Sequence, residues 1–278
     1  MAKHMACMTF DFDAMSGLIA RGMKSPTAIS RGEFGVIGVR RVLALLKKHN
    51  IPATFYVPGV VIEMYPQVCE EIVASGHEIG HHGWNHVPPG KLEAQEEEHL
   101  LRGIQAIERL TGVKPRGYRS PSWDLSPVTV ELLLRHGFLY DSSMMGNDYS
   151  PYRARIGDHI EEDGPVVFGR ETTLVEIPIS WSLDDFVHFE YLKTETAIIS
   201  GLMNANGVLE NWTDDFAYMT RTTEQGVLTY TCHPYVIGRG HRMMMLERLL
   251  LNLMERNAVF RRVEDVAREY ITTPSEFK

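Results

Sequence analysis

The stretch Met8-Thr9-Phe10-Asp11-Phe12-Asp13 predicts a β-strand whose end carries two carboxylates. Because residues i and i+2 of a strand point to the same side, Asp11 and Asp13 are expected to face one space. Two carboxylates flanked by Phe10 and Phe12 repel each other unless a cation lies between them. A pair of exposed aspartates at a turn is the alternative, and this stretch alone does not decide between the two.

Strand-like and helix-like segments alternate outward from this strand. Further strands are predicted at about 53–57, 78–80, 117–119, 174–177 and 227–231. Helices are predicted over about 35–49, up to residue 74, over 93–110, from Ser126-Pro127 to Gly137, and over 243–256 as the final helix. This order predicts an α/β fold with a parallel sheet covered by helices, and with the chemistry at the carboxyl ends of the strands.

Two segments are expected to lie outside this regular pattern. The Gly-, Ser- and Pro-bearing stretch Ala14–Arg31 is expected to be a loop that folds over the site as a lid. The stretch Gly146–Gly169 lacks clear periodicity and is expected to be a long surface excursion. Since the 278 residues show no repeat and no low-complexity tract, we expect one domain over residues 1–278.

The charge and cysteine content argue against several classes of protein. The net charge is -8 and no basic stripe is present, so no nucleic-acid partner is expected. The N-terminal residues lack the apolar core of a signal peptide, and Glu247 and Arg248 interrupt the apolar stretch 243–254, so no membrane span is expected. The three cysteines are widely spaced, which favours a reducing compartment. We therefore expect a cytoplasmic protein.

The stretch His82-Gly83-Trp84-Asn85-His86 is the strongest local signal for a metal site. Four of the 12 histidines fall between His77 and His86. On a helical turn, residues i and i+4 lie on one face, close enough to bind one metal ion. The alternative is a solvated loop whose histidines cap backbone groups. Together with one carboxylate from the first strand, however, the two histidines form the ligand set of a hydrolytic zinc site.

Four motifs, in order along the chain, resemble those of one protein family. Thr9–Asp13 is similar to the motif Thr-Phe-Asp-Asp-Gly, and Gly76–His86 contains a stretch similar to His-(Ser/Thr)-x-x-His. Tyr118–Trp123 is similar to an Arg-x-Pro motif with an aromatic residue, and Cys232-His233-Pro234 to a histidine at a strand end. Over nearly its whole length the chain therefore resembles the polysaccharide deacetylase (NodB-homology, carbohydrate esterase 4-like) family.

Two further stretches indicate a branch of that family. Ser30-Arg31-Gly32 and Trp181–Asp185 resemble an intracellular branch that includes cyclic imide hydrolases, allantoinase-like enzymes and peptidoglycan-deacetylase-like proteins. The resemblance implies a single-domain distorted (β/α) barrel, and the branch implies a homo-oligomer.

The resemblance also implies a metal site and a base. Asp13, His82 and His86 would hold one divalent metal ion, and Asp11 would be the general base. Arg119 would pair with Asp11 and keep it ionised, since an adjacent cation lowers the pKa of a carboxyl group. An ordinary surface role for Arg119 is the alternative.

A general acid is implied at the last motif. His233 would protonate the departing nitrogen, and Asp184 or Asp185, with Asp185 preferred, would orient His233 or bind substrate. The alternative is that His233 only ends a strand. The chain departs from the family pattern at two positions, because Phe12 separates the two aspartates and Gly83 replaces the usual Ser or Thr.

The implied reaction is metal-assisted hydrolysis of an amide or imide carbon–nitrogen bond. Zinc is the first choice for a set of two histidines and one carboxylate, with manganese, cobalt or nickel as alternatives. A small cyclic imide or related small amide is the favoured substrate, because no export signal is found. The alternative is N-deacetylation of a polysaccharide that contains N-acetylglucosamine, of the peptidoglycan or chitin type. A non-catalytic carbohydrate-binding barrel is a third hypothesis, and the retained metal set argues against it.

Overall fold

Strand β1 (His4–Asp11) lies in the interior of the fold and is buried from Met5 to Asp11. In the computed structural model, which describes residues 4–193 and 198–277, β1 pairs in parallel with β12 (Gly226–Cys232) on one side and β2 (Thr54–Val57) on the other. All residues of β2 and β12 are buried as well. Strands buried on both faces are characteristic of a parallel sheet that is covered by helices.

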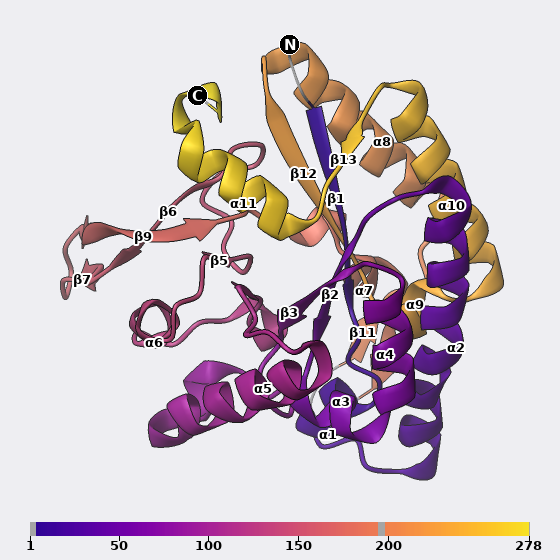
Figure 1. Cartoon of the computed structure of the whole chain (residues 1–278), viewed down its shortest axis with the longest axis horizontal. Coiled ribbons are helices and arrows are strands. Elements are labelled where there is room, and N and C mark those ends of the chain that lie inside the picture. The colour runs from indigo at the N-terminus through magenta and orange to yellow at the C-terminus, as the bar shows by residue number, and fades with distance from the viewer. Residues whose placement is uncertain (1–3, 194–197, 278) are drawn as a thin grey trace.

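The main sheet curls into a half-barrel (Figure 1). Its order is β12-β1-β2-β3-β4-β5-β9-β6, with β13 (Val259–Phe260) beside β1. The remaining strands of this sheet are β3 (Glu78–His81), β4 (Gly117–Tyr118), β5 (Tyr140–Asp141), β9 (Arg170–Glu176) and β6 (Tyr152–Ile156). All pairs are parallel except β6 with β9. The α/β barrel expected from the sequence is confirmed, although one edge of the sheet is antiparallel; the single-domain extent over residues 1–278 stays a prediction.

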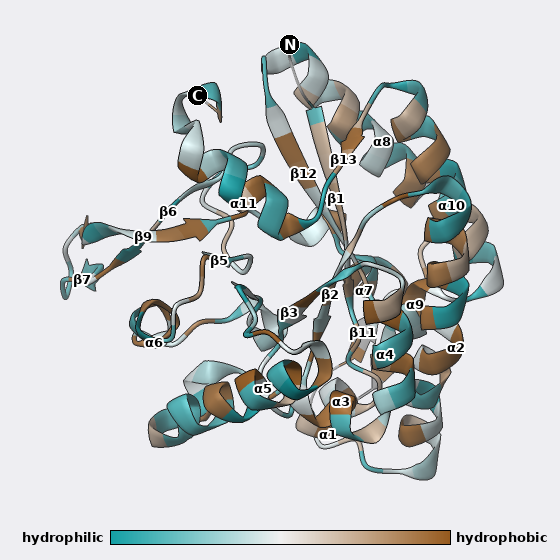
Figure 2. Cartoon of the chain, in the orientation of Figure 1, coloured by the Kyte–Doolittle hydropathy of each residue, from teal (hydrophilic) through white to brown (hydrophobic). Residues whose placement is uncertain are grey.

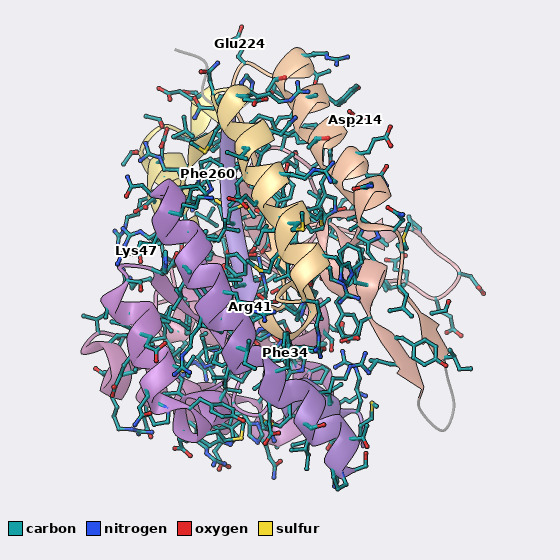
Figure 3. All side chains as sticks on the ribbon, turned by 90° about the vertical axis from the view of Figure 1, so that its right-hand side faces the viewer. Phe34, Arg41, Lys47, Asp214, Glu224 and Phe260 are labelled. Carbon is teal, nitrogen blue, oxygen red and sulfur yellow. The ribbon has the colours of Figure 1, made fainter. Side chains whose placement is uncertain are left out.

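Helices cover the outside of the sheet. The helices before the sheet's midpoint are α1 (Ser16–Ala20), α2 (Pro26–His49), α3 (Gly59–Met64), α4 (Pro66–Ala74) and α5 (Glu96–Thr111). The later ones are α6 (Thr129–Arg135), α7 (Asp185–Phe189), α8 (Ala205–Thr222), α9 (Pro234–Ile237), α10 (Gly240–Glu255) and α11 (Val263–Thr272). Figure 3 shows α2, α10 and α8 side by side, with Lys47 and Asp214 on their solvent side.

The apolar residues of these helices pack against the sheet. A large cluster of buried side chains joins β1 and β2 to α2, α8 and α10, and it includes Phe10, Phe55, Leu46, Trp212 and Leu249. The rings of Phe10 and Phe55 are stacked with centroids 5.0 Å apart. In Figure 2 the outer helices carry both colours, whereas the middle of β12 is brown. Among the described residues, no helix combines the length and the apolar character that crossing a bilayer requires.

The loop expected over Ala14–Arg31 is wrong, whereas the role of this stretch as a lid stays a prediction. This stretch contains α1, and α2 begins at Pro26, nine residues before the predicted start. The Ser25 side chain accepts a hydrogen bond from the Ala28 amide. Proline suits the first helical position because its nitrogen carries no hydrogen that would lack an acceptor there. Ser25-Pro26 is therefore a helix start that the loop prediction overlooked.

Other predicted boundaries also differ from the structure. Helix α6 begins at Thr129 rather than at Ser126-Pro127, because the Ser126 hydroxyl donates to Glu96 and its oxygen accepts from the Val128 amide. The predicted helix up to residue 74 is divided at Tyr65, since Pro66 starts a new helix. Helix α11 follows α10, which was expected to be last.

The stretch Gly146–Gly169 is more ordered than the expected excursion. It contains β6 and a hairpin of β7 (His159–Ile160) with β8 (Val166–Val167), which form an arm at the left of Figure 1 together with β9. Strand β10 (Tyr191–Lys193) pairs antiparallel with β11 (Ile198–Ser200) in a separate two-stranded sheet. The hairpin of β7 and β8 is exposed, so the expected surface location of this stretch is confirmed. The stretch nevertheless contains regular strands, which its lack of periodicity did not predict.

Gly38 permits a close approach between α2 and the start of α9. A Cβ at this position would lie 1.9 Å from the Pro234 carbonyl oxygen, a contact that no side chain can make. Pro234 follows His233, so this contact also fixes the backbone at one of the predicted site residues.

We predict that Gly38→Ala lowers the free energy of unfolding by about 1–3 kcal/mol, because the overpacking outweighs the better helix propensity of alanine. The matched control is Gly207→Ala in α8, where a Cβ meets nothing within 4 Å. That substitution is expected to stabilise the protein by up to about 1 kcal/mol. Urea unfolding of both variants provides the measurement, and equal stability of Gly38→Ala and the wild type would contradict the predicted clash.

Candidate metal centre and active site

Asp11 and Asp13 converge on one space at the carboxyl end of β1. Asp11 is the last residue of β1 and is 1% exposed, and Asp13 is 4% exposed. Asp11 Oδ2 lies 3.8 Å from His82 Nε2, while Asp13 Oδ1 lies 3.4 Å from the same nitrogen. The predicted convergence of the two carboxylates is therefore present in the structure.

His82 and His86 meet Asp13, but not from a helical turn. They lie in an irregular loop after β3, in which Gly83 and His86 have positive φ angles of 71° and 62°. Glycine adopts this conformation without strain, and a histidine does so only where its surroundings hold it. The His86 Nε2 atom lies 3.1 Å from Asp13 Oδ2. The predicted helical turn is wrong, although the predicted proximity of the two imidazoles is present.

The hydrogen bond of His82 Nδ1 leaves the Nε2 atom of the same ring free to bind a metal ion. Its Nδ1 atom donates to the Arg119 carbonyl oxygen at 2.7 Å, since a carbonyl can only accept. The lone pair therefore resides on Nε2, which faces Asp13. Second-sphere carbonyls fix metal-binding histidines in this way in many proteins.

The Asp13, His82 and His86 group fits a divalent cation. Its ligand atoms lie within 4.8 Å of one another, and all three residues are buried. Asp13 Oδ1 is buried without a hydrogen-bond partner, which is costly unless a cation lies beside it. Burial would raise the pKa of Asp13, but the imidazoles of His86 and His82 outweigh it and lower the pKa below its usual range. Two imidazoles and one carboxylate are the ligand set of many hydrolytic metal sites.

Arg119 holds Asp11 in place from beneath the site. It follows β4 and is completely buried. Its Nη1 donates to Asp11 Oδ1 and to Thr9 Oγ1, both at 2.8 Å, and its guanidinium lies 4.1 Å from the Tyr56 ring centroid. Burial disfavours the charge, but the Asp11 carboxylate outweighs it and raises the pKa of Arg119. The predicted pair of Arg119 and Asp11 is thus formed, and Arg119 is not a surface residue.

His233 is held by Asp185 at the end of β12. Asp185 Oδ1 accepts hydrogen bonds from His233 Nδ1 at 2.8 Å and from its backbone amide at 2.9 Å. The Nε2 atom of His233 faces the metal group, 3.8 Å from Asp13 Oδ2. Burial lowers the pKa of His233, but the carboxylates of Asp184 and Asp185 outweigh it and raise the pKa to about 10. His233 is therefore protonated at neutral pH and has a proton to give.

The two aspartates beside His233 have different partners. The Asp184 side chain accepts from the Phe186 amide at 2.8 Å and caps α7, while its Oδ1 lies 3.5 Å from His233 Nδ1. Burial raises the pKa of Asp184 to about 7. The possible ligand atoms of Asp184, Asp185 and His233 also lie within 4.8 Å of one another, close enough to hold a metal ion. Because Nδ1 of His233 is used in the hydrogen bond to Asp185, this second group is better described as an imidazolium between carboxylates.

The site residues line a cavity with a volume of about 290 Å³. The lining also includes Phe186 and Val187, which no predicted motif contained, Arg21 from the Ala14–Arg31 stretch and Ser122 from the Tyr118–Trp123 motif. Trp123 and Trp181, which belong to the quoted motifs, form a stacked pair in the wall with ring centroids 4.2 Å apart. Ligand pockets commonly measure about 300–1,000 Å³, so this cavity suits a single small ring or one sugar unit.

The support behind Arg119 was also not predicted. Its Nε donates to the Ser142 carbonyl and its Nη2 to the Ser142 hydroxyl, both at 3.0 Å. The neighbouring Ser143 hydroxyl donates to Asp141 Oδ1 at 2.7 Å and accepts from the Ser120 amide at 2.8 Å. Nothing in the sequence distinguishes these serines from the serines of surface turns.

Comparisons with known proteins agree with this geometry. The model of the family described as Polysaccharide deacetylase matches residues 35–140. Over 263 residues the chain is 38% identical to a peptidoglycan deacetylase of Helicobacter pylori, which covers 90% of this chain and 89% of that one.

Solved structures share the fold over almost the whole chain. A Mycobacterium smegmatis protein that carries the provisional name polysaccharide deacetylase is 30% identical, with a TM-score of 0.85 and coverage of 98% of this chain and 92% of that one. An allantoinase structure, 23% identical with a TM-score of 0.77, covers 98% of this chain and 91% of its own and shares the fold. The chain therefore belongs to the polysaccharide deacetylase family and is a hydrolase of that family.

Proposed function

We propose that this protein is a metal-dependent hydrolase that removes the acetyl group from an N-acetylated amino sugar, of the kind found in peptidoglycan or chitin. The observation that carries the proposal is the convergence of three buried groups on one cavity. Asp13, His82 and His86 line it together, Asp11 lines it while paired with Arg119, and His233 lines it while paired with Asp185. The peptidoglycan deacetylase of Helicobacter pylori at 38% identity supports the N-acetyl sugar over the cyclic imide that the sequence favoured.

The residues divide the reaction between them. A divalent cation held by Asp13, His82 and His86 would act as a Lewis acid and lower the pKa of a water molecule. Zinc is the first choice for this ligand set, and manganese, cobalt or nickel are the alternatives.

Asp11 acts as the general base in this proposal. Its Oδ1 is occupied by Arg119, so Oδ2, which faces the metal group, is the oxygen that accepts a proton from the attacking water. The hydrogen bond and ion pair with Arg119 fix the carboxylate in orientation.

His233 acts as the general acid. Its Nε2 faces the metal group and carries the proton that the departing nitrogen needs, while Asp185 fixes Nδ1–H and thereby the ring orientation. The aromatic walls formed by Trp123, Trp181 and Phe186 exclude water from one side of the substrate and pack against its ring.

A small cyclic imide or amide is the second candidate substrate. The observation that favours it is the cavity volume of about 290 Å³, which admits one ring more readily than a length of polymer. An imide nitrogen also leaves as a stabilised anion, so this reaction depends less on His233.

We further propose that the protein works in the cytoplasm as a homo-oligomer. All three cysteines are buried and free, as expected for a reducing compartment. The oligomer rests on the resemblance to the intracellular branch alone.

We predict that zinc-loaded protein releases acetate from N-acetylglucosamine or chitin oligomers, and that a chelator abolishes the release. Succinimide, glutarimide, dihydrouracil and allantoin are tested in parallel by ring opening. Turnover of the cyclic compounds alone would replace the proposed substrate by the second candidate. Absence of turnover on every compound, together with absence of bound metal, would leave a non-catalytic binding protein.

We predict that His82→Gln weakens zinc affinity by at least about 10- to 100-fold, because it removes a ligand whose orientation the Arg119 carbonyl fixes. The control is His159→Gln on the exposed strand β7, which should retain the metal. Elemental analysis after dialysis against buffered zinc gives the metal content. If both variants hold as much zinc as the wild type, the metal lies elsewhere.

We predict that His233→Ala lowers kcat on N-acetyl sugars by about 10²–10⁴-fold while zinc content is unchanged. Asp185→Asn should cause a smaller loss, because His233 remains but is no longer held by a carboxylate. Initial rates and metal analysis on both variants give the result. Unchanged kcat in His233→Ala on N-acetyl sugars would exclude the acid role, whereas unchanged kcat on imides alone would support the second candidate.

A further inference from the structure

Arg21 is a cation in the active-site cavity that the proposed reaction does not use. It directly follows α1, in the stretch that the sequence predicted as a lid, and it is half-buried in the cavity wall. Its Nη1 donates to the Gly17 carbonyl oxygen at 2.8 Å. Among the residues that the structure describes, Arg21 takes part in no ion pair, and of its five N–H donors only one at Nη1 has a hydrogen-bond acceptor there.

The other charged groups of the cavity have partners. Asp11 is paired with Arg119, and Asp184 lies beside His233. Asp13 is in contact with imidazoles and would bear the metal. Arg21 therefore provides a positive charge that nothing else within the described lining of the cavity neutralises.

Arg21 is close to the metal group. A Cβ built on Gly17 would lie 3.2 Å from Arg21 Nη1 and 3.4 Å from Asp13 Oδ2, so both atoms border the same small space. A substrate whose amide reaches Asp13 would thus place a neighbouring substituent within reach of the guanidinium.

Phe186 fixes the side of the cavity on which Arg21 lies. The Arg21 guanidinium lies 5.3 Å from the Phe186 ring centroid, and the same ring lies 5.5 Å from the ring of His233. This cation–π contact limits the orientations of the guanidinium but occupies none of its hydrogen-bond donors. Arg21 and His233 therefore flank the same aromatic wall, in the cavity that the metal group also lines.

We infer that Arg21 is a specificity residue that binds an anionic substituent of the substrate, a carboxylate or a phosphate, next to the amide bond that is cut. This inference rests on the proposed function and narrows its substrate to an anionic N-acyl compound. Arginine suits the task because its planar fork donates two parallel hydrogen bonds to either group.

The test compares neutral and anionic members of two matched series. The probes are N-acetylglucosamine and its 6-phosphate, and dihydrouracil and its 6-carboxylate. Zinc-loaded wild type, Arg21→Met and Arg21→Lys are titrated by calorimetry, and KM is measured wherever turnover occurs. Lys24→Met is the control, because it removes the same charge from a nearby exposed position outside the cavity.

The wild type is expected to bind the anionic member of at least one series more tightly than the neutral one. Arg21→Met should weaken that binding by about 10- to 100-fold, as expected for a charge-assisted hydrogen bond, without changing the neutral probe. Arg21→Lys should recover part of the loss, and Lys24→Met should match the wild type. The series that responds identifies the phosphate or the carboxylate as the anion.

Three results would overturn the inference. An anion preference that persists in Arg21→Met would show that the metal alone provides it. An equal loss for neutral and anionic probes would indicate a role in the transition state or in folding. Binding of neither anion would leave Arg21 without a ligand while hydrolysis of neutral compounds remained. Conversely, Arg21-dependent anion binding without any hydrolysis would sustain the inference and remove only the proposed reaction.

Discussion

The buried ion pair between Arg119 and Asp11 is the interaction on which the site depends. Taking two charges out of water costs several kcal/mol per ion, and only good geometry with further hydrogen bonds offsets that cost. Arg119 meets this condition through Thr9 and Ser142 in addition to Asp11. Its backbone carbonyl also binds His82 Nδ1. One residue thus orients the predicted base through its side chain and a predicted metal ligand through its main chain.

A second layer of buried charge stands behind this pair. Glu176 Oε1 accepts from the amides of Ser143 and Met144, and Ser143 donates to Asp141. Burial raises the pKa of Asp141 to about 6, and burial together with Asp141 raises the pKa of Glu176 well above its usual range. Burial and the neighbouring Asp141 thus disfavour a charge on Glu176. Its Oε1 holds the backbone of Ser143 and Met144, directly after the Ser142 that supports Arg119.

Local sequence signals predicted the parts of the site that lie close together in the chain or on one strand. Strand periodicity placed Asp11 and Asp13 on one side, and the resemblance supplied Arg119 and His233. The i, i+4 spacing of His82 and His86 predicted a helical turn that is not present. Positive φ angles in an irregular loop bring the two imidazoles together instead.

Contacts between distant segments had no local signature at all. Ser142 meets Arg119 across 23 residues, and Arg21, in the turn that directly follows α1, reaches the cavity although no local pattern marks it as a wall residue. Nothing in the sequence beside these two residues distinguishes them, so only the assembled sheet and helices show what they touch. The fold class was predictable from the alternation of strand-like and helix-like segments. The residues that hold the site in place, in contrast, come together only when the sheet and the helices pack.

The cavity wall and the reacting residues share the same support. Ser122 and Trp123 have φ angles of 59° and 54°, and a non-glycine residue in this region costs about 1–3 kcal/mol. Trp123 stacks on Trp181, which offsets part of this strain, and its ring lies 5.9 Å from the Arg119 guanidinium. Because Arg119 also fixes Asp11, a change that shifts this arginine displaces the aromatic wall and the base together. The aromatic wall and the base are therefore coupled through one buried guanidinium, whereas Arg21 lies on a separate segment and takes part in none of the hydrogen bonds that hold Arg119.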